Sequence, residues 1–146
     1  MQTPTLPFRL DASRREHQLA LFNSRKEIHW FGFRGVFREP GLASVTFTEL
    51  AEGMQGGGGT AAVNGGGIAA GFDAAFVLAG LGHYDSDIVI TVELSIKFLS
   101  LALVSDTLSF NAHVVRSGKN FAFAEGFLAD GDRHLAVATA IVAPPR

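Results

Sequence analysis

The residues best suited to do chemistry lie in one apolar, glycine-rich segment, VNGGGIAAGFDAAFVLAG, at 63–80. Its composition predicts a helix that is apolar on most faces. Glycines at 65–67 would leave the first backbone N–H groups of that helix unshielded, so a carbonyl oxygen gaining negative charge could approach closely. Asp73 is the one carboxylate in the segment.

Asp73 and these glycines cannot meet within one chain. Asp73 lies eight residues beyond Gly65, which corresponds to about 12 Å along a helix axis. Two subunits with antiparallel helices would bring Asp73 of one copy to the Gly65 end of the other, and the active site would then require a dimer. Two structural interpretations stay open: Asp73 as a buried acid that pairs with a base or caps a loop, and the glycines as points of close helix packing.

Other kinds of site find little support. GGGIAA, at 65–70, satisfies G-x-G-x-x-[GA], but consecutive strands are predicted after the helix and no Gly-Lys-Ser/Thr motif is present, so nucleotide-binding folds do not fit. The chain has no cysteine. Its histidines show no ligand spacing, and they are His17, His29, His83, His113 and His134. We therefore predict no metal site and no cofactor.

Length and charge describe one ordinary domain. We predict a single domain over the 146 residues, with an N-terminal helix and its lead-in at 1–26. The 12 basic and 14 acidic side chains give a formal charge of −2, so the chain has no overall excess of positive charge that would favour binding to nucleic acid. Asp73 and six glycines argue against a membrane span over 61–82. The start lacks the order of a secretory signal, so we expect a cytoplasmic location.

Hydrophobic periodicity predicts the elements before the central helix. Residues 11–26 form an amphipathic pattern that is typical of a short helix. Residues 28–38 and 42–50 are predicted to be two strands of a hairpin, joined at the turn EPG, 39–41. A glycine-rich loop at 53–63 then leads into the helix.

Beyond the central helix the pattern changes to that of strands. Residues 88–99 alternate with period two, which predicts a strand with one buried face. Three more strands are expected near 107–116, 121–129 and 133–142, because short polar turns separate them. These four strands are predicted to form a meander that curls around the helix, an α+β architecture.

Residues 63–142 resemble the hotdog-fold acyl-CoA thioesterases, in particular the phenylacetate-degradation (PaaI-like) type. In that family the central helix opens with His-Gly-Gly and carries an Asp nine residues after the His. The same spacing is kept here by Asn64, Gly65, Gly66 and Asp73. TVELSIKFL, at 91–99, and the segment at 105–142 match as well. The resemblance implies a hotdog fold, in which a curved antiparallel sheet wraps around a long helix, and a homodimer, expected to form a dimer of dimers.

The resemblance also implies an activity, the hydrolysis of an acyl- or aryl-CoA thioester to a free acid and coenzyme A at the dimer interface. Asp73 would act as general base on water or as nucleophile. The backbone N–H of Gly66, supported by the helix dipole, would hold the developing oxyanion. Thr91 falls where relatives carry a Ser or Thr that orients the water or the carboxylate. An outward-facing threonine in a strand is the alternative.

The coenzyme A phosphates require local cations. By resemblance to the family's hairpin, the candidates in the turn RSGKN are Arg116, Lys119 and Asn120. A solvated turn is the alternative interpretation. The aromatic residues at 29–37 are candidates to line an acyl or aryl pocket, or else belong simply to the core.

Two positions depart from the family pattern. Asn64 replaces the family's His and cannot donate a proton as an imidazolium would. The amide that relatives carry in the preceding loop falls on Gly58, and only a shift makes Gln55 the candidate. Two alternatives stay open. One is a hydratase or dehydratase of acyl thioesters, which would pair its acid with a His and is therefore disfavoured by Asn64. The other is a non-catalytic acyl-CoA-binding hotdog protein.

Overall fold

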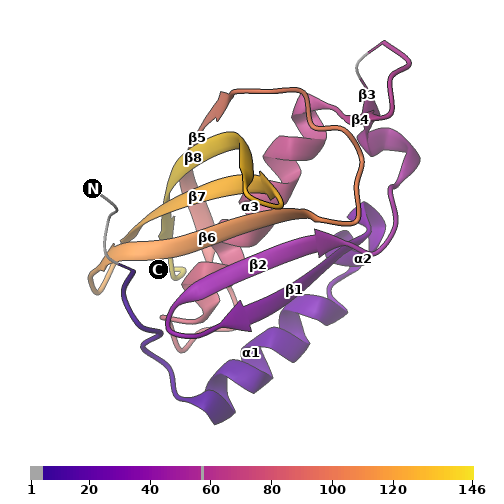
Figure 1. Cartoon of the computed structure of the whole chain (residues 1–146). Helices are drawn as coiled ribbons and strands as arrows, with labels where there is room; N and C mark the ends of the chain where they lie inside the picture. Colours follow the sequence, from indigo (N-terminus) through magenta and orange to yellow (C-terminus); the bar gives the residue numbers. More distant parts are fainter. Residues whose placement is uncertain (1–4, 57) are drawn as a thin grey trace.

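The computed structural model describes residues 5–56 and 58–146, and it places one long helix in the curve of an antiparallel sheet (Figure 1). The elements are α1 (Ala12–Ser24), α2 (Lys26–Phe31), β1 (Phe33–Arg38), β2 (Leu42–Phe47), the 3-10 turn η1 (Glu52–Met54), β3 (Gln55–Gly56), β4 (Ala62–Val63), α3 (Gly65–Leu81), β5 (Ile90–Phe98), β6 (Leu108–Ser117), β7 (Ala122–Asp130) and β8 (Arg133–Ala143). The predicted α+β hotdog architecture is confirmed. Residues 1–4 of the predicted lead-in and Gly57 of the predicted loop lie outside the described residues.

The predicted meander is only partly correct. The six-stranded sheet has the order β1-β2-β6-β7-β8-β5, with antiparallel neighbours throughout. The last three predicted strands do follow one another, but β5 pairs with β8 and not with β6. Residues 99–107 carry the chain from the β5 edge to β6, which lies beside β2. β5, which precedes this segment, and β6, which follows it, are therefore not neighbours, because β8 and β7 lie between them in the sheet.

The predicted strand over 28–38 is wrong in its first part, because residues 26–31 form the short helix α2. Arg25 is extended before this helix, and Gly32 ends it in the left-handed region with φ 74°. The turn lets Ile28 reach the core. The aromatic residues of this segment favoured a strand. Because Gly32 adopts the left-handed conformation, it ends the helix α2 and separates it from the strand β1. The hairpin of β1 and β2 is confirmed.

Close packing explains two glycines of α3. A Cβ at Gly71 would lie 2.2 Å from the ring of Phe110, and one at Gly67 would lie 2.7 Å from the sulfur of Met54. Both distances are impossible for real side chains, so the glycines let the helix approach the sheet and the preceding loop. The packing interpretation is therefore correct for these two positions.

The apolar face predicted for the β5 segment is only partly buried in this chain. Ile90, Val92 and Phe98 are 46%, 51% and 56% exposed, whereas Leu94 and Ile96 are partly buried. A register shift between residues 91 and 93 interrupts the alternation. β5 is an edge strand, so one row of its backbone groups is not paired within the sheet.

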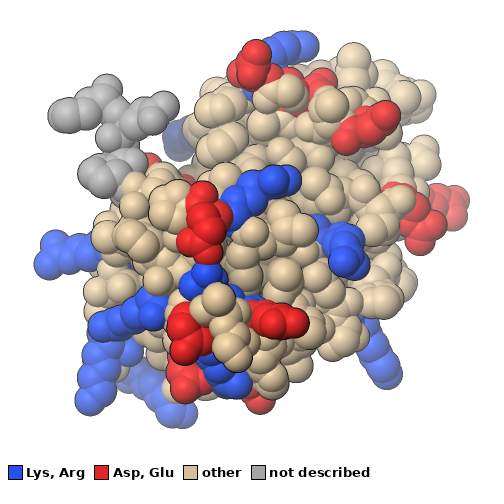
Figure 2. Space-filling model, turned by 60° about the horizontal axis from the view of Figure 1, so that its bottom comes forward, with Lys and Arg blue, Asp and Glu red and all other residues tan. Residues whose placement is uncertain are grey.

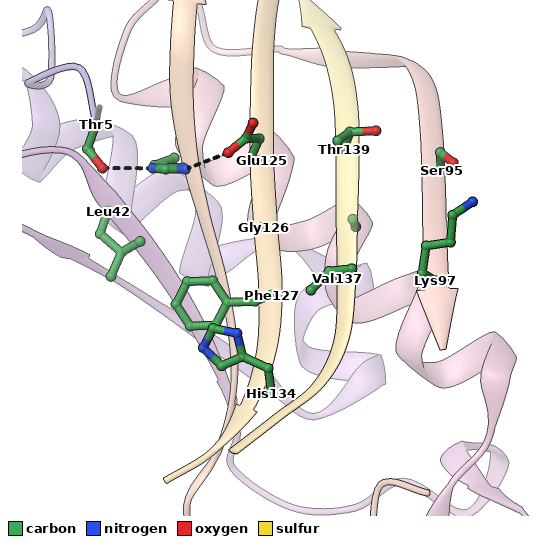
Figure 3. A pocket seen from close by; sticks show the side chains of 12 residues that line it. Thr5, Leu42, Ser95, Lys97, Glu125, Gly126, Phe127, His134, Val137 and Thr139 are labelled. Carbon is green, nitrogen blue, oxygen red and sulfur yellow. Dashed lines mark hydrogen bonds and ion pairs between the residues drawn. The ribbon is translucent and has the colours of Figure 1, made fainter. Parts of the chain in front are cut away.

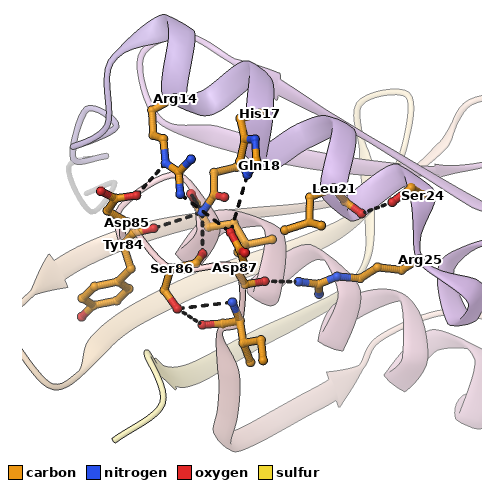
Figure 4. A network of polar contacts seen from close by, with 12 residues as sticks. Arg14, His17, Gln18, Leu21, Ser24, Arg25, Tyr84, Asp85, Ser86 and Asp87 are labelled. Atoms are coloured by element: carbon orange, nitrogen blue, oxygen red, sulfur yellow. Dashed lines mark hydrogen bonds and ion pairs between the residues drawn. The ribbon is translucent and has the colours of Figure 1, made fainter.

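Polar contacts hold α1 against the connection between α3 and β5 (Figure 4). The Nε of Arg14 donates to Oδ1 of Asp85 over 2.6 Å, and Nη2 of Arg25 donates to the carbonyl of Asp87 over 2.6 Å. The buried amide of Gln18 donates to three carbonyls, those of Leu81, Tyr84 and Ser86. These bonds fix the path of the chain into β5 and hence the position of Thr91.

Charge is distributed without a dominant sign on the face shown in Figure 2, where basic and acidic side chains are interspersed with wide uncharged areas. This agrees with the formal charge of −2. None of the described helices is long and apolar enough to cross a membrane.

A buried histidine predicts how stability depends on pH. His83 follows α3, is 3% exposed, and its Nε2 has no hydrogen-bond partner among the described residues. Burial, and then the charge of Arg9, lowers the pKa of His83 from 6.5 to about 4. Between these values the unfolded chain binds a proton that the folded chain does not bind. Stability present above about pH 6.5 is therefore lost as the pH falls, by about 2 kcal/mol at pH 5.

Urea unfolding at about pH 7.5 and about pH 5 measures this effect. We expect His83→Phe, which packs a similar ring but cannot titrate, to remove most of the difference between the two pH values. His134→Gln, at an exposed histidine, serves as the control and should keep the difference. An unchanged pH dependence in His83→Phe would contradict the assignment.

Candidate functional site

The N-terminus of α3 presents free backbone donors. Asn64 is the N-cap, and its Oδ1 accepts the N–H of Gly67 over 2.7 Å. The N–H groups of Gly65 and Gly66 have no partner among the described residues, and both glycines are exposed. A Cβ at Gly65 would only touch the ring of Phe98 at 3.8 Å. These two glycines, unlike Gly67, are not required by packing, and they leave the donors open to an incoming oxygen.

The side chain of Asn64 is fully engaged. Besides capping the helix, its Nδ2 donates to the carbonyl of Gly53 over 2.8 Å and to that of Gln55 over 3.0 Å. Both amide hydrogens and the amide oxygen are thus used to hold the loop on the helix end. Gln55 therefore lies next to the site, whereas Gly58 lies at a loop position with φ 66° and no atoms near its added Cβ. Of the two candidates for the loop amide, Gln55 is the nearer.

The engaged amide predicts a stability role for Asn64. Asn64→Ser keeps a capping oxygen but cannot reach the loop carbonyls, so we expect a loss of about 1 to 2 kcal/mol from the two missing hydrogen bonds. Urea unfolding measures the loss, and Asn120→Ser, in an exposed turn, is the matched control. If Asn64→Ser were as stable as the unaltered protein, the loop bonds would contribute nothing.

Asp73 and Thr91 lie together, although 18 positions separate them in the chain. The Oγ1 of Thr91 donates to Oδ1 of Asp73 over 2.6 Å. Asp73 is exposed on α3, so the interpretation as a buried acid is wrong. Its second oxygen, Oδ2, has no hydrogen-bond partner among the described residues. The threonine orients the carboxylate and leaves one oxygen available to a water molecule or an acyl group.

The structure does not bring Asp73 to the glycines of its own chain. Both lie on α3, and the offset of Asp73 from Gly65 is about 12 Å along the helix axis. β5 runs alongside this stretch of α3, because Thr91, which contacts Asp73, is near its start and Phe98, which lies beside Gly65, is at its end. One chain therefore carries two half-sites, one at each end of β5.

The candidate residues for coenzyme A lie at the Thr91 end of the sheet. Arg116, Lys119 and Asn120 are exposed in and beside the turn between β6 and β7. Ala122, just after that turn, pairs with Val142, which pairs with Thr91 on its other side. Two strand spacings separate Ala122 from Thr91, or about 10 Å. The turn is thus near the Asp73 half-site of its own chain.

Two pockets flank the half-sites. The pocket at the start of α3, here called the Trp30 pocket, has a volume of about 420 Å³. It is lined by Trp30, Phe31, Ala51, Glu52, Gly53, Met54, Asn64, Gly66 and Gly67. No sequence pattern pointed to Met54, because it lies in the predicted loop, which has no periodicity.

The Asp73 pocket, of about 550 Å³, lies between α3 and the helices α1 and α2. Besides apolar residues, its walls carry Arg25, Glu27, Asp73 and Asp87.

A third pocket, of about 650 Å³, lies on the other face of the sheet, away from α3 (Figure 3). There Nδ1 of His113 is 2.7 Å from the hydroxyl of Thr5, and Nε2 is 3.6 Å from Glu125. Burial lowers the pKa of His113, while the charge of Glu125 opposes this effect. His134 stacks on Phe127 with ring centroids 4.3 Å apart. The sheet separates this pocket from both half-sites.

Comparisons with known proteins agree with the fold. Residues 61–137 match the sequence profile of the thioesterase superfamily. The Escherichia coli PaaI protein from the phenylacetic acid degradation operon superposes with a TM-score of 0.77 and 21% identity, over 93% of this chain and 97% of that one. A thioesterase from Haemophilus influenzae gives a TM-score of 0.76 and 14% identity, over 94% of each chain. A conserved protein from Pseudomonas aeruginosa superposes with a TM-score of 0.72 and 20% identity, over 84% of this chain and 95% of that one. No curated protein matches the sequence.

Proposed function

Because this chain belongs to the thioesterase superfamily, in agreement with the resemblance seen at 63–142, we propose that it is an acyl-CoA thioesterase. It hydrolyses an acyl- or aryl-CoA to a free acid and coenzyme A, at a site formed between two copies of the chain. One observation carries the proposal: the oriented carboxylate of Asp73, at the middle of α3, and the open N–H groups of Gly65 and Gly66, at its start, lie on one helix but too far apart to act together within one chain.

The edge strand β5 supports the dimer. Its outer side is unpaired, and its side chains at Ile90, Val92 and Phe98 are exposed. Antiparallel pairing of two β5 strands about their middle residue, Leu94, would set Ile90 of one copy, next to Thr91, opposite residue 98 of the other copy. Each Asp73 would then approach the Gly65 end of the other helix, and two equivalent sites would form. A dimer of dimers, expected from the resemblance, stays a prediction.

The chemistry follows from these groups. Asp73 takes a proton from water, and the water oxygen attacks the thioester carbonyl carbon. The carbonyl oxygen becomes an oxyanion, which accepts hydrogen bonds from the Gly65 and Gly66 N–H groups at the positive end of the helix dipole. The C–S bond then breaks, and coenzyme A leaves as a thiolate that takes up a proton. Direct attack by Asp73, followed by hydrolysis of the resulting anhydride, uses the same groups.

The leaving group fits the basic turn. Arg116 and Lys119 are exposed near the Asp73 end of the sheet, and we assign them, with Asn120, to the phosphates of coenzyme A. No cofactor or metal takes part in the proposed reaction.

A non-catalytic acyl-CoA-binding protein is the second candidate. The observation in its favour is Asn64, which stands in place of the family's histidine and spends its whole amide on structural hydrogen bonds. It therefore supplies no proton to the reaction. The same observation disfavours a hydratase, which would need a proton donor at this position.

Thiol release from a panel of short, medium, long and aryl acyl-CoAs tests the proposal. We expect turnover of at least one thioester and loss of that turnover in Asp73→Asn. Binding of acyl-CoA by calorimetry without any thiol release would select the non-catalytic candidate. Neither binding nor hydrolysis across the panel would refute both.

A further inference from the structure

Trp30 is the only tryptophan of the chain, and it is 76% exposed. It lies in α2, whose short turn sets it beside Phe31 with ring centroids 5.3 Å apart in an edge arrangement. An exposed indole leaves a large apolar surface in water, and a ligand in an adjoining pocket would cover part of it. The same two rings form one wall of the Trp30 pocket, and Gly66 lies in its lining.

The two pockets beside the half-sites differ in character. The Trp30 pocket is walled by Trp30, Phe31 and Met54, and Glu52 is the one charged residue in its lining among the residues that the structure describes. The Asp73 pocket carries four ionisable side chains on its walls. An apolar group that enters the Trp30 pocket displaces less water from charged side chains than one that enters the Asp73 pocket. The free-energy cost of desolvation is therefore lower in the Trp30 pocket. Its volume of about 420 Å³ also falls within the range of small-molecule sites.

Building on the proposed function, we infer that the Trp30 pocket takes the acyl group of the thioester and that Trp30 makes the protein prefer aromatic acyl groups to short aliphatic ones. Because Gly66 lines this pocket, a carbonyl oxygen that accepts a hydrogen bond from its N–H would place the acyl group beside the pocket. The edge-to-face pair of Trp30 and Phe31 offers both a ring face and a ring edge to a third ring. The thioether of Met54 adapts to the shape of the remaining space.

The single tryptophan makes occupancy directly observable. Phenacyl-CoA and acetonyl-CoA are ketone analogues in which a methylene separates the sulfur from the carbonyl, so neither can be hydrolysed. We expect phenacyl-CoA to shift or quench the Trp30 emission in a saturable manner. Acetonyl-CoA should bind, as calorimetry would show, with little effect on the emission. Phenacyl-CoA that binds by calorimetry without changing the emission would overturn the inference.

Kinetics provide the second readout. We expect Trp30→Ala to lower kcat/KM for phenylacetyl-CoA by about tenfold, and that for acetyl-CoA by less than about twofold, whereas Trp30→Phe keeps most of the preference. The comparison variant is Ile88→Ala, which shortens a side chain of the Asp73 pocket. It should leave the ratio of the two substrates unchanged.

The outcomes separate the inference from the proposed function. A ratio that changes in Ile88→Ala but not in Trp30→Ala would place the acyl group beside Asp73 and overturn the inference alone. An unaltered protein that hydrolyses no thioester, yet shows the emission change with phenacyl-CoA, would contradict the proposed function and support the pocket assignment. Turnover with equal loss for both substrates in Trp30→Ala would also overturn the inference.

Discussion

Asp73→Asn is expected to lower kcat by about 10²- to 10⁴-fold, because the amide cannot take a proton from water or attack the carbonyl. The amide oxygen can still accept the hydrogen bond that Thr91 now donates over 2.6 Å. The exposed side chain makes no other polar contact within the described residues, so the fold should be unaffected. KM should change little, since the loss concerns the transition state.

Two variants complete this measurement, which follows thiol release with the best acyl-CoA of the panel. Asp106→Asn removes an exposed acid from the segment between β5 and β6 and should leave kcat unchanged. Thr91→Val removes only the orienting hydrogen bond, so we expect a smaller loss, about tenfold. Full activity of Asp73→Asn would remove this residue from the mechanism.

Gly66→Pro is expected to lower kcat by about 10²- to 10³-fold, the usual effect of deleting one oxyanion donor. Proline is tolerated in the first turn of a helix, and the N–H that it removes bonds to nothing in the described part of the chain. The preceding residue, Gly65, can best adapt to the restriction that proline imposes. Circular dichroism and urea unfolding should therefore match those of the unaltered protein.

Gly66→Ala is the matched control, because it keeps the N–H and adds a methyl group 3.3 Å from Oδ1 of Asn64. We expect a modest rise in KM, since the methyl group narrows the approach, and a nearly unchanged kcat. Equal losses of kcat in the proline and alanine variants would mean that bulk at this position, and not the donor, matters.

The central helix and the last three strands could be predicted from the sequence because their periodicity is strong and their turns are short. The pairing of β5 could not, since a period of two determines which side chains share a face but not which strand lies alongside. α2 was missed because its aromatic residues favour strands, while a left-handed Gly32 was needed to end a helical turn.

The candidate site was predictable in its residues but only partly in its geometry. Spacing alone showed that Asp73 and Gly65 cannot meet in one chain, but Thr91 entered through the resemblance, and the contact itself depends on how β5 lies against α3. The full engagement of Asn64 depends on a loop without periodicity, so no pattern predicted it. The glycines divide by packing: Gly67 and Gly71 are required by close contact, whereas Gly65 and Gly66 are not.

Subunit complementation tests most directly whether the site is shared between two chains. Asp73→Asn and Gly66→Pro protomers, each nearly inactive alone, are co-refolded in equal amounts, and native mass spectrometry confirms the hybrid dimers. A hybrid dimer has one site with both defects and one site with none. Random mixing makes about half of the dimers hybrids, so about a quarter of all sites are intact and about a quarter of the unaltered activity should return. Hybrid dimers no more active than the separate variants would contradict the shared site.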